Sequence, residues 1–171
     1  LNTTAFANDV SLSADGSIVA TPGGVYKNIN NSWTKIGNDT DRYFPSQVSL
    51  SDDGSTVAGV RLGQIYKNID NNWTKIGIVT DDISGYKSTL SADGSIVAIG
   101  NGNGGNEKDI GHVRIYKNIN NTWTQIGSDI VGEVAGDYSG ETISLSDDGT
   151  IVAIGAWRND GNGIDSGHVR I

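Results

Sequence analysis

Two short phrases alternate along the chain, and this repetition constrains the fold more than any other feature. The first is Tyr-Lys-Asn-Ile-Asn-Asn-x-Trp-Thr-x-Ile-Gly, with Asp in place of one Asn in its second copy, and it begins at Tyr26, Tyr66 and Tyr116. The second is Leu-Ser-x-Asp-Gly, which begins at Leu12, Leu50, Leu90 and Leu145. A tandem array with a period of roughly 40–50 residues is typical of β-propellers. A β-solenoid is the alternative, but its coils are shorter and lack paired hairpin turns.

The first copy of the unit shows how the repeat is expected to fold. Alternating apolar and polar residues, followed by a short apolar run, predict a half-buried strand and then a fully buried one. Asp15-Gly16 and Asn30-Asn31 separate the runs, and these residue types tolerate the positive φ of tight turns. The four strands predicted in this unit span residues 10–13, 18–20, 25–29 and 33–36. Joined by tight turns, they form an antiparallel meander.

The same pattern recurs along the whole chain, without the apolar spacing of a helix. We therefore predict a single all-β domain over residues 1–171, a β-propeller whose blades are four-stranded antiparallel meanders. Its units span residues 8–37, 46–77, 87–127 and 141–171. The fourth unit has only three predicted strands. We expect residues 1–7 to add the missing strand, and the alternative is that later sequence or another chain supplies it.

The fourth unit carries a defined order of motifs. It reads Gly136-Asp-Tyr-Ser-Gly140, then Ile143-Ser-Leu-Ser-Asp-Asp-Gly149, then Val152-Ala-Ile-Gly-Ala156, and finally Gly167-His-Val-Arg-Ile171. This order resembles the FG-GAP repeat of integrin-α-type β-propellers, although Tyr-Ser-Gly stands where Phe-Gly is usual and Trp157 replaces a proline. The resemblance implies a propeller of the secreted or cell-surface type found in microbes. It does not imply a particular activity.

The charge balance argues against two classes of partner. The chain has 12 basic and 20 acidic residues, which gives a formal net charge of −8. Nucleic acids and anionic membrane surfaces are bound chiefly through Lys and Arg, so we expect neither as a partner. No apolar run approaches the roughly 18 residues of a membrane span, so we expect no membrane insertion.

The Asp-Gly turns invite comparison with calcium loops, because FG-GAP propellers often bind calcium in Asp-x-Asp-x-Asp-Gly loops. Each turn here offers one or two carboxylates, whereas calcium takes about six to eight oxygen ligands. The loop over residues 159–166 is richer in oxygen ligands, and Asp160, Asn162 and Asp165 form a weak candidate calcium site within it. We expect no other cofactor.

A ligand-binding site is expected between the third and fourth units. The longest predicted loops lie there, and function tends to reside on variable loops carried by a rigid scaffold. Trp157 has no counterpart in the other units, and exposed tryptophans are frequent in recognition. The predicted ligand-binding residues are Trp157, Arg158, Asn159, Tyr138 and Asn103. The tryptophans that recur at one position of the repeat are instead expected to pack between blades: Trp33, Trp73 and Trp123.

Three functions follow from these observations. The leading prediction is a non-enzymatic extracellular or cell-surface module for adhesion, which binds a protein or a glycan. The sequence shows neither a nucleophile–base pair nor a cluster of zinc ligands. The first alternative is a structural subunit whose copies join through open strand edges. The second alternative is a glycan-directed hydrolase that uses paired carboxylates such as Asp160 and Asp165.

Overall fold

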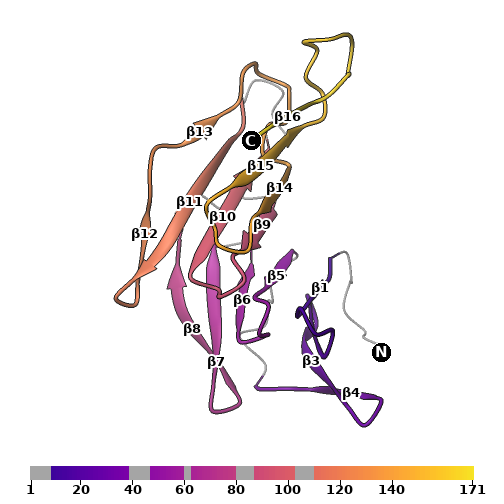
Figure 1. Cartoon of the computed structure of the whole chain (residues 1–171), viewed down its shortest axis with the longest axis vertical. Coiled ribbons are helices and arrows are strands. Elements are labelled where there is room, and N and C mark those ends of the chain that lie inside the picture. The colour runs from indigo at the N-terminus through magenta and orange to yellow at the C-terminus, as the bar shows by residue number, and fades with distance from the viewer. Residues whose placement is uncertain (1–8, 39–46, 60–62, 80–86, 103–109) are drawn as a thin grey trace.

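The chain forms four antiparallel sheets that follow one another along an elongated molecule (Figure 1). The computed structural model describes residues 9–38, 47–59, 63–79, 87–102 and 110–171. Every helix or strand within these ranges is a β-strand. The sheets are arranged as the four blades of a β-propeller, so the predicted all-β propeller class is confirmed.

The strands of the first three blades pair in chain order, as a meander requires. Blade 1 contains β1 (Ser11–Leu12), β2 (Ile18–Thr21), β3 (Gly24–Ile29) and β4 (Ser32–Lys35). Blade 2 contains β5 (Val48–Leu50), β6 (Thr56–Gly59), β7 (Gln64–Ile69) and β8 (Asn72–Ile78). Blade 3 contains β9 (Lys87–Leu90), β10 (Ile96–Asn101), β11 (His112–Ile119) and β12 (Thr122–Gln125).

The third and fourth blades depart from this uniform plan. Blade 3 has an additional strand, β13 (Ile130–Val131), which pairs with the start of β11. The sequence did not predict β13, because two residues are too few to show a period. Blade 4 contains β14 (Thr142–Leu145), β15 (Val152–Ala156) and β16 (His168–Arg170). The fourth strand expected from residues 1–7 falls outside the described residues.

The turns between the third and fourth strands are the two-residue hairpins that the sequence predicted. In blade 1 both central residues have positive φ, 51° at Asn30 and 64° at Asn31. The Asp-Asn and Asn-Asn turns of blades 2 and 3 have nearly the same angles. This backbone matches the twist of antiparallel strands, and Asn tolerates it better than most residues.

The Ser-x-Asp-Gly turn is longer than a two-residue hairpin. Only its glycine has positive φ, 68° at Gly16. Asp15 Oδ1 accepts hydrogen bonds from Ser13 Oγ at 2.7 Å and from Ser17 N at 2.9 Å. The same serine-to-aspartate bond closes the other three turns, also at 2.7 Å. The aspartate of each turn therefore stabilises the turn itself.

Each inner blade packs its front face on the preceding blade and its back face on the following blade. Between blades 1 and 2, Ala20 and Val25 of the back face share one buried cluster with five front-face residues: Val48, Leu50, Val57, Tyr66 and Trp73. Equivalent positions form the core between blades 2 and 3: Ala58, Ile65, Leu90, Val97 and Tyr116. Ala98, Val113 and Ile154 continue it between blades 3 and 4. One interface is thus repeated three times.

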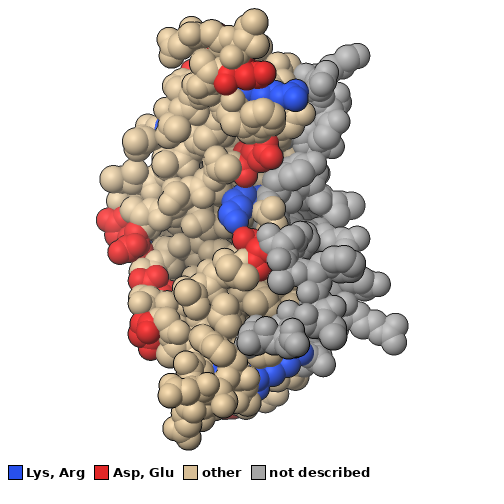
Figure 2. All heavy atoms as spheres, turned by 90° about the vertical axis from the view of Figure 1, so that its right-hand side faces the viewer, with Lys and Arg blue, Asp and Glu red and all other residues tan. Residues whose placement is uncertain are grey.

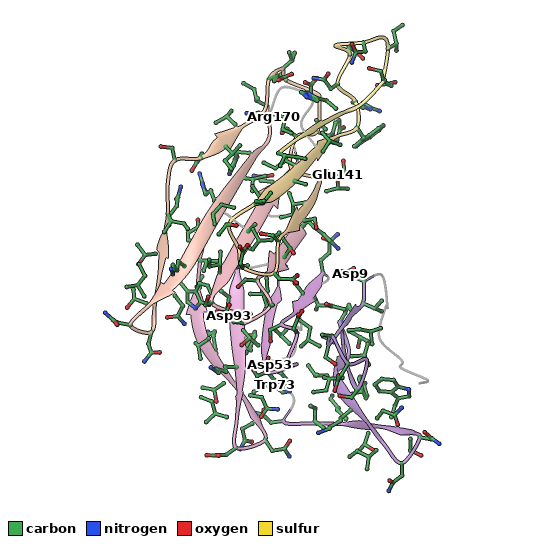
Figure 3. The ribbon with its side chains drawn as sticks, viewed as in Figure 1. Asp9, Asp53, Trp73, Asp93, Glu141 and Arg170 are labelled. Carbon is green, nitrogen blue, oxygen red and sulfur yellow. The ribbon has the colours of Figure 1, made fainter. Side chains whose placement is uncertain are left out.

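Trp73 shows how the recurrent tryptophans serve this interface (Figure 3). Its side chain is 4 % exposed, and its Nε1 donates to Ile36 O of blade 1 at 3.1 Å. Trp123 packs against the equivalent core between blades 2 and 3. The predicted packing role of these two residues is confirmed.

Backbone hydrogen bonds join the Ser-x-Asp-Gly turns of successive blades. The backbone amides of Ala14, Asp52 and Ala92 each donate a hydrogen bond to the carbonyl oxygen at the same position of the next blade, at a distance of 2.9 Å. Asp9, near the first strands of the blades, also joins them (Figure 3). Its carboxylate accepts a hydrogen bond from Val48 N at 2.9 Å and forms an ion pair with Lys87 Nζ at 3.2 Å. These polar contacts fix the register between blades.

Candidate functional site

A linker and a loop meet at one end of blades 3 and 4. The linker, residues 132–141, connects β13 to β14, and the loop, residues 157–167, connects β15 to β16. An open pocket of about 590 Å³ lies between the linker and the loop. Its lining residues are Glu133, Val134, Ala135, Gly136, Asp137, Arg158, Asn159, Asp160, Gly161 and Asp165.

Glycines allow the linker to lie directly on blade 3. A Cβ atom on Gly100 of β10 would overlap the carbonyl oxygen of Gly140, and one on Gly111 would overlap that of Ser139. Gly140 N also donates to Gly155 O of β15 at 3.1 Å. The linker backbone is therefore held between blades 3 and 4 and gives the pocket a fixed wall.

Tyr138 lies on this linker in an unusual backbone conformation. Its φ is 59°, in the left-handed region that non-glycine residues seldom adopt. Such conformations cost about 1–3 kcal/mol, and they concentrate at functional sites, where the surrounding structure enforces them. The enforcing contacts here are the Gly140 bond to β15 and a hydrogen bond from Glu141 N to Tyr138 O at 3.2 Å.

Asn159 holds the loop onto the linker. Its side chain is buried, and its Nδ2 donates to Asp137 Oδ2 at 2.7 Å and to Glu133 Oε2 at 3.3 Å. Its Oδ1 accepts from Gly161 N at 3.0 Å. We predicted Asn159 as a ligand-binding residue. It lines the pocket with a side chain that is largely buried and already bonded to the linker.

Three of the predicted residues form a contiguous group, which we call the Trp157 platform: Tyr138, Trp157 and Arg158. Arg158 is the member that lines the pocket. The two rings are tilted by 42° with centroids 5.3 Å apart. The Arg158 guanidinium lies 4.8 Å from the Trp157 ring centroid and 5.1 Å from that of Tyr138. Trp157 is 49 % exposed, and its Nε1 donates to Glu141 Oε2, which fixes the ring.

The candidate calcium ligands Asp160, Asn162 and Asp165 are all exposed on the outer part of the loop. Asp160 Oδ1 accepts a hydrogen bond from Asp165 N at 2.7 Å, so this carboxylate helps to shape the loop. Within the described ranges, no group of three or more His, Cys, Asp or Glu side chains is placed to hold a metal ion. Asn103, the remaining predicted ligand-binding residue, lies outside the described residues.

Sequence reasoning missed three acidic residues of the site: Glu133, Asp137 and Glu141. Asp137 is buried and Glu133 lies 3.4 Å from His168 Nδ1, so both are tied into the scaffold. Asp137 lies inside the Gly-Asp-Tyr-Ser-Gly motif, and this motif is the sequence feature that could have identified it as a site residue. Nothing local in the sequence singles out Glu133 or Glu141, because their partners are on β16 and in the loop after β15.

The pocket is acidic. Its lining includes four carboxylate residues (Glu133, Asp137, Asp160 and Asp165) and one basic residue, Arg158. Acidic and basic side chains are interspersed on the face shown in Figure 2, without a continuous basic patch among the residues described there. The arrangement suits a neutral or cationic ligand group better than an anionic one.

Comparisons with known proteins identify the fold only. No family model matches the sequence, and no curated protein matches it. Among solved structures, hydrazine synthase of Kuenenia stuttgartiensis is similar, with a TM-score of 0.59 and 15% identity, over 90% of this chain and 45% of that one. A candidate 6-phosphogluconolactonase of Bacteroides fragilis has a TM-score of 0.53 and 16% identity, over 85% of this chain and 46% of that one. Another from Bacteroides uniformis has a TM-score of 0.54 and 13% identity, over 95% of this chain and 55% of that one.

The chain therefore spans about half the length of the solved structures that it resembles. These similarities support the propeller fold, and the resemblance to the FG-GAP repeat remains a prediction. In the part of the chain that the structure describes, no helix is long and apolar enough to cross a membrane.

Proposed function

We propose that the chain is a non-enzymatic extracellular or cell-surface module that binds a neutral glycan at the Trp157 platform. The observation that supports this function most directly is a half-exposed tryptophan held in a fixed orientation beside a polar pocket. A rigid aromatic ring offers binding surface at little cost in conformational entropy. Stacking on it suits the apolar face of a sugar ring.

The pocket supplies the polar half of glycan recognition. Carboxylates accept hydrogen bonds from hydroxyl groups, and Arg158 donates them. Asp160 and Asp165 are exposed and line the pocket, so carboxylate oxygens are available there to a ligand. A few fixed polar groups around an aromatic surface are typical of small-ligand sites.

The proposed location rests on the FG-GAP resemblance of the fourth unit. The leading alternative for the ligand is a basic segment of a protein, because the acidic pocket would also attract Lys or Arg side chains. The experiment below separates these two ligands.

Binding of the purified chain to a glycan array, followed by titration calorimetry with the best ligand, tests the proposal. Trp157→Ala should weaken binding roughly 10-fold or more, since loss of an aromatic contact worth about 1.4 kcal/mol corresponds to a factor of ten. Trp157→Phe should retain part of the affinity. Ile164→Ala, in the same loop but 91 % exposed and outside the pocket lining, is the matched control and should bind normally.

Two outcomes would count against the proposal. Absence of binding to any glycan, combined with binding to basic peptides that is lost in Asp160→Asn, would assign the pocket to a protein ligand. Cleavage of a bound glycan would show that the module is an enzyme.

A further inference from the structure

The two terminal blades expose faces that the inner blades bury. On the front face of blade 1, Val10 is 62 % exposed and Leu12 is 56 % exposed. Their counterparts in blade 2, Val48 and Leu50, are 3 % and 6 % exposed because blade 1 covers them. Among the described residues, the front face of blade 1 is thus the interface surface of the repeat left uncovered.

The back face of blade 4 shows the complementary situation. Its apolar residues are Ile151, Val169 and Ile171, which are 55 %, 64 % and 91 % exposed. At the same repeat positions, Ile96 and Val113 of blade 3 are 8 % and 0 % exposed. The described strands of blades 1 and 4 make no extensive contact with each other, and the two blades lie toward opposite ends of the molecule (Figure 1).

A contact that recurs at every internal interface identifies these faces as two halves of one surface. The glycine of each Ser-x-Asp-Gly turn lies against the first residue after the turn of the preceding blade. A Cβ atom on Gly54 would lie 2.5 Å from Ile18 Cδ1, and one on Gly149 would lie 2.6 Å from Ile96 Cδ1. Gly16 has nothing within 4 Å at this position, and Ile151 is exposed. The open glycine and the uncovered isoleucine are the missing partners of this contact.

The polar contacts between blades end in the same complementary way. Among the described residues, the series of backbone hydrogen bonds between turns does not use two groups: the carbonyl of Ala14 at one end and the amide of Asp147 at the other. The amides of Leu50 and Leu90 donate to the hydroxyl of the preceding blade's Ser11 and Ser49, at 2.9 and 3.0 Å. Leu12 N and Ser144 Oγ occupy the corresponding positions on the two open faces.

We propose that the back face of blade 4 in one copy of the chain packs on the front face of blade 1 in a second copy. This contact continues, between chains, the interface that occurs three times within the chain. Two copies joined in this way supply eight blades, within the range of four to eight that β-propellers commonly have. Two such arcs also match the length of the similar solved propellers, of which one chain covers about half.

The symmetry of this contact distinguishes it from other modes of association. Each interface uses two different surfaces, so the contact is heterologous, and it closes when the two ends of a pair meet. Association through open strand edges, which the sequence suggested, would instead extend the outer strands of the blades. The proposal is independent of the glycan site, which lies on a linker and a loop.

Sedimentation velocity of the full chain across a concentration series tests the proposal. We expect a shift from 18.0 kDa to twice this mass as concentration rises. Leu12→Lys and Val169→Lys should each shift the association midpoint at least 10-fold toward higher concentration, because each places a charge in both interfaces of the closed pair. Ile164→Lys is the control, since it adds the same charge at a site 91 % exposed and away from both faces.

Mixing the two variants provides the decisive measurement. One intact back face and one intact front face remain in the mixture, so the mixed sample should associate at a concentration at which each variant alone is still monomeric. If only one substitution disrupts the oligomer, the contact joins like faces and the proposal is wrong. A chain that is monomeric at every concentration, or an oligomer that neither variant affects, would also overturn it; the faces would then belong to additional blades or to another partner.

Discussion

The aspartate of the Ser-x-Asp-Gly turn illustrates how a residue that looks like a metal ligand serves the fold. In Asp15 the hydrogen bond from Ser13 is the largest cause of a pKa lowered to about 2. In Asp148 the bond from the Thr150 amide contributes most, followed by that from Ser146, and the pKa is again about 2. These carboxylates are held in the charged form by donors of their own turns.

The first prediction concerns acid stability. An unfolded Asp has a pKa of about 3.9, whereas Asp15 and Asp148 have values of about 2 in the folded chain. The stabilisation is therefore complete above about pH 4 and is lost as the pH falls toward about 2. Urea denaturation at a series of pH values should show the free energy of unfolding decreasing across this window.

Asp148→Asn and Ser146→Ala provide the corresponding variants, because the first removes the titrating group and the second removes one donor. Both should make the pH dependence shallower. A profile that is flat in the native chain between pH 4 and pH 2 would contradict this account.

The second prediction contrasts two tryptophans. Trp73 is 4 % exposed between blades 1 and 2, so Trp73→Ala should cost about 3–5 kcal/mol, the usual cost of truncating a buried large aromatic side chain. Trp157 is half-exposed, so Trp157→Ala should cost about 1 kcal/mol or less. Equal shifts of the denaturation midpoint would refute the assignment of one residue to packing and the other to recognition.

At the scale of the element, the Ile-Gly pair that ends the first phrase shows how a repeat adapts to its neighbours. Gly37 follows β4 with a φ of 75°, and a Cβ atom there would overlap the Trp73 ring of the next blade. Gly127 follows β12 with a φ of 71° and has nothing within 4 Å. The two glycines share a backbone conformation and differ in whether the next blade brings a tryptophan.

The third prediction uses this difference. Gly127→Ala should cost about 1–2 kcal/mol, since only the left-handed backbone is strained. Gly37→Ala should cost about 1–3 kcal/mol more, because the added methyl group also displaces a packed ring. Thermal or urea denaturation of the two variants measures the difference directly. Equal losses would mean that the ring of Trp73 moves aside without cost.

The linker before β14 shows what a connecting element contributes to the site. Its glycines bring the backbone onto β10 and β11, and Arg170 of β16 donates from Nη1 to Val131 O of β13 at 2.6 Å (Figure 3). Blades 3 and 4 are therefore tied together by the linker and by Arg170. A fixed wall of this kind keeps Tyr138 and Trp157 in place before a ligand arrives.

The whole molecule has a gradient of burial from its centre to its two ends. Strands β6 and β10 are buried along their full length, whereas β1 and β16 contain no buried residue. In a repeat array, each unit is stabilised mainly by its neighbours. The terminal blades, with one neighbour each, are expected to open more readily than the central blades.

The fourth prediction follows from this gradient. In hydrogen exchange of the dilute chain, amides of β6 and β10 should be protected most, and those of β1 and β16 least, because local opening tracks local packing. Protection of β1 and β16 should increase with protein concentration if a second copy covers the terminal blades. Uniform protection along a monomeric chain would show that the four blades open as a single unit.

Local sequence determined the parts of this protein that depend on near neighbours. Alternation with period two placed the strands, and Asn-Asn and Asp-Asn pairs fixed the hairpins, because both depend on backbone preferences of adjacent residues. The repeat then determined the propeller class, since identical sheets that cannot bury both faces alone must stack. Even the site was predicted in outline, from loops that differ between otherwise similar units.

Only the tertiary structure decided which of these loop residues act together. Trp157 lies on the loop after β15 and Tyr138 on the linker before β14, and their rings meet only in the folded chain. Asn159, which we predicted as a ligand-binding residue, lines the pocket and also joins two segments, because its partners Asp137 and Glu133 come from the linker. The open faces of blades 1 and 4 are likewise invisible in the sequence, where Leu12 and Leu50 occupy the same phrase; what separates them is whether another blade covers the leucine.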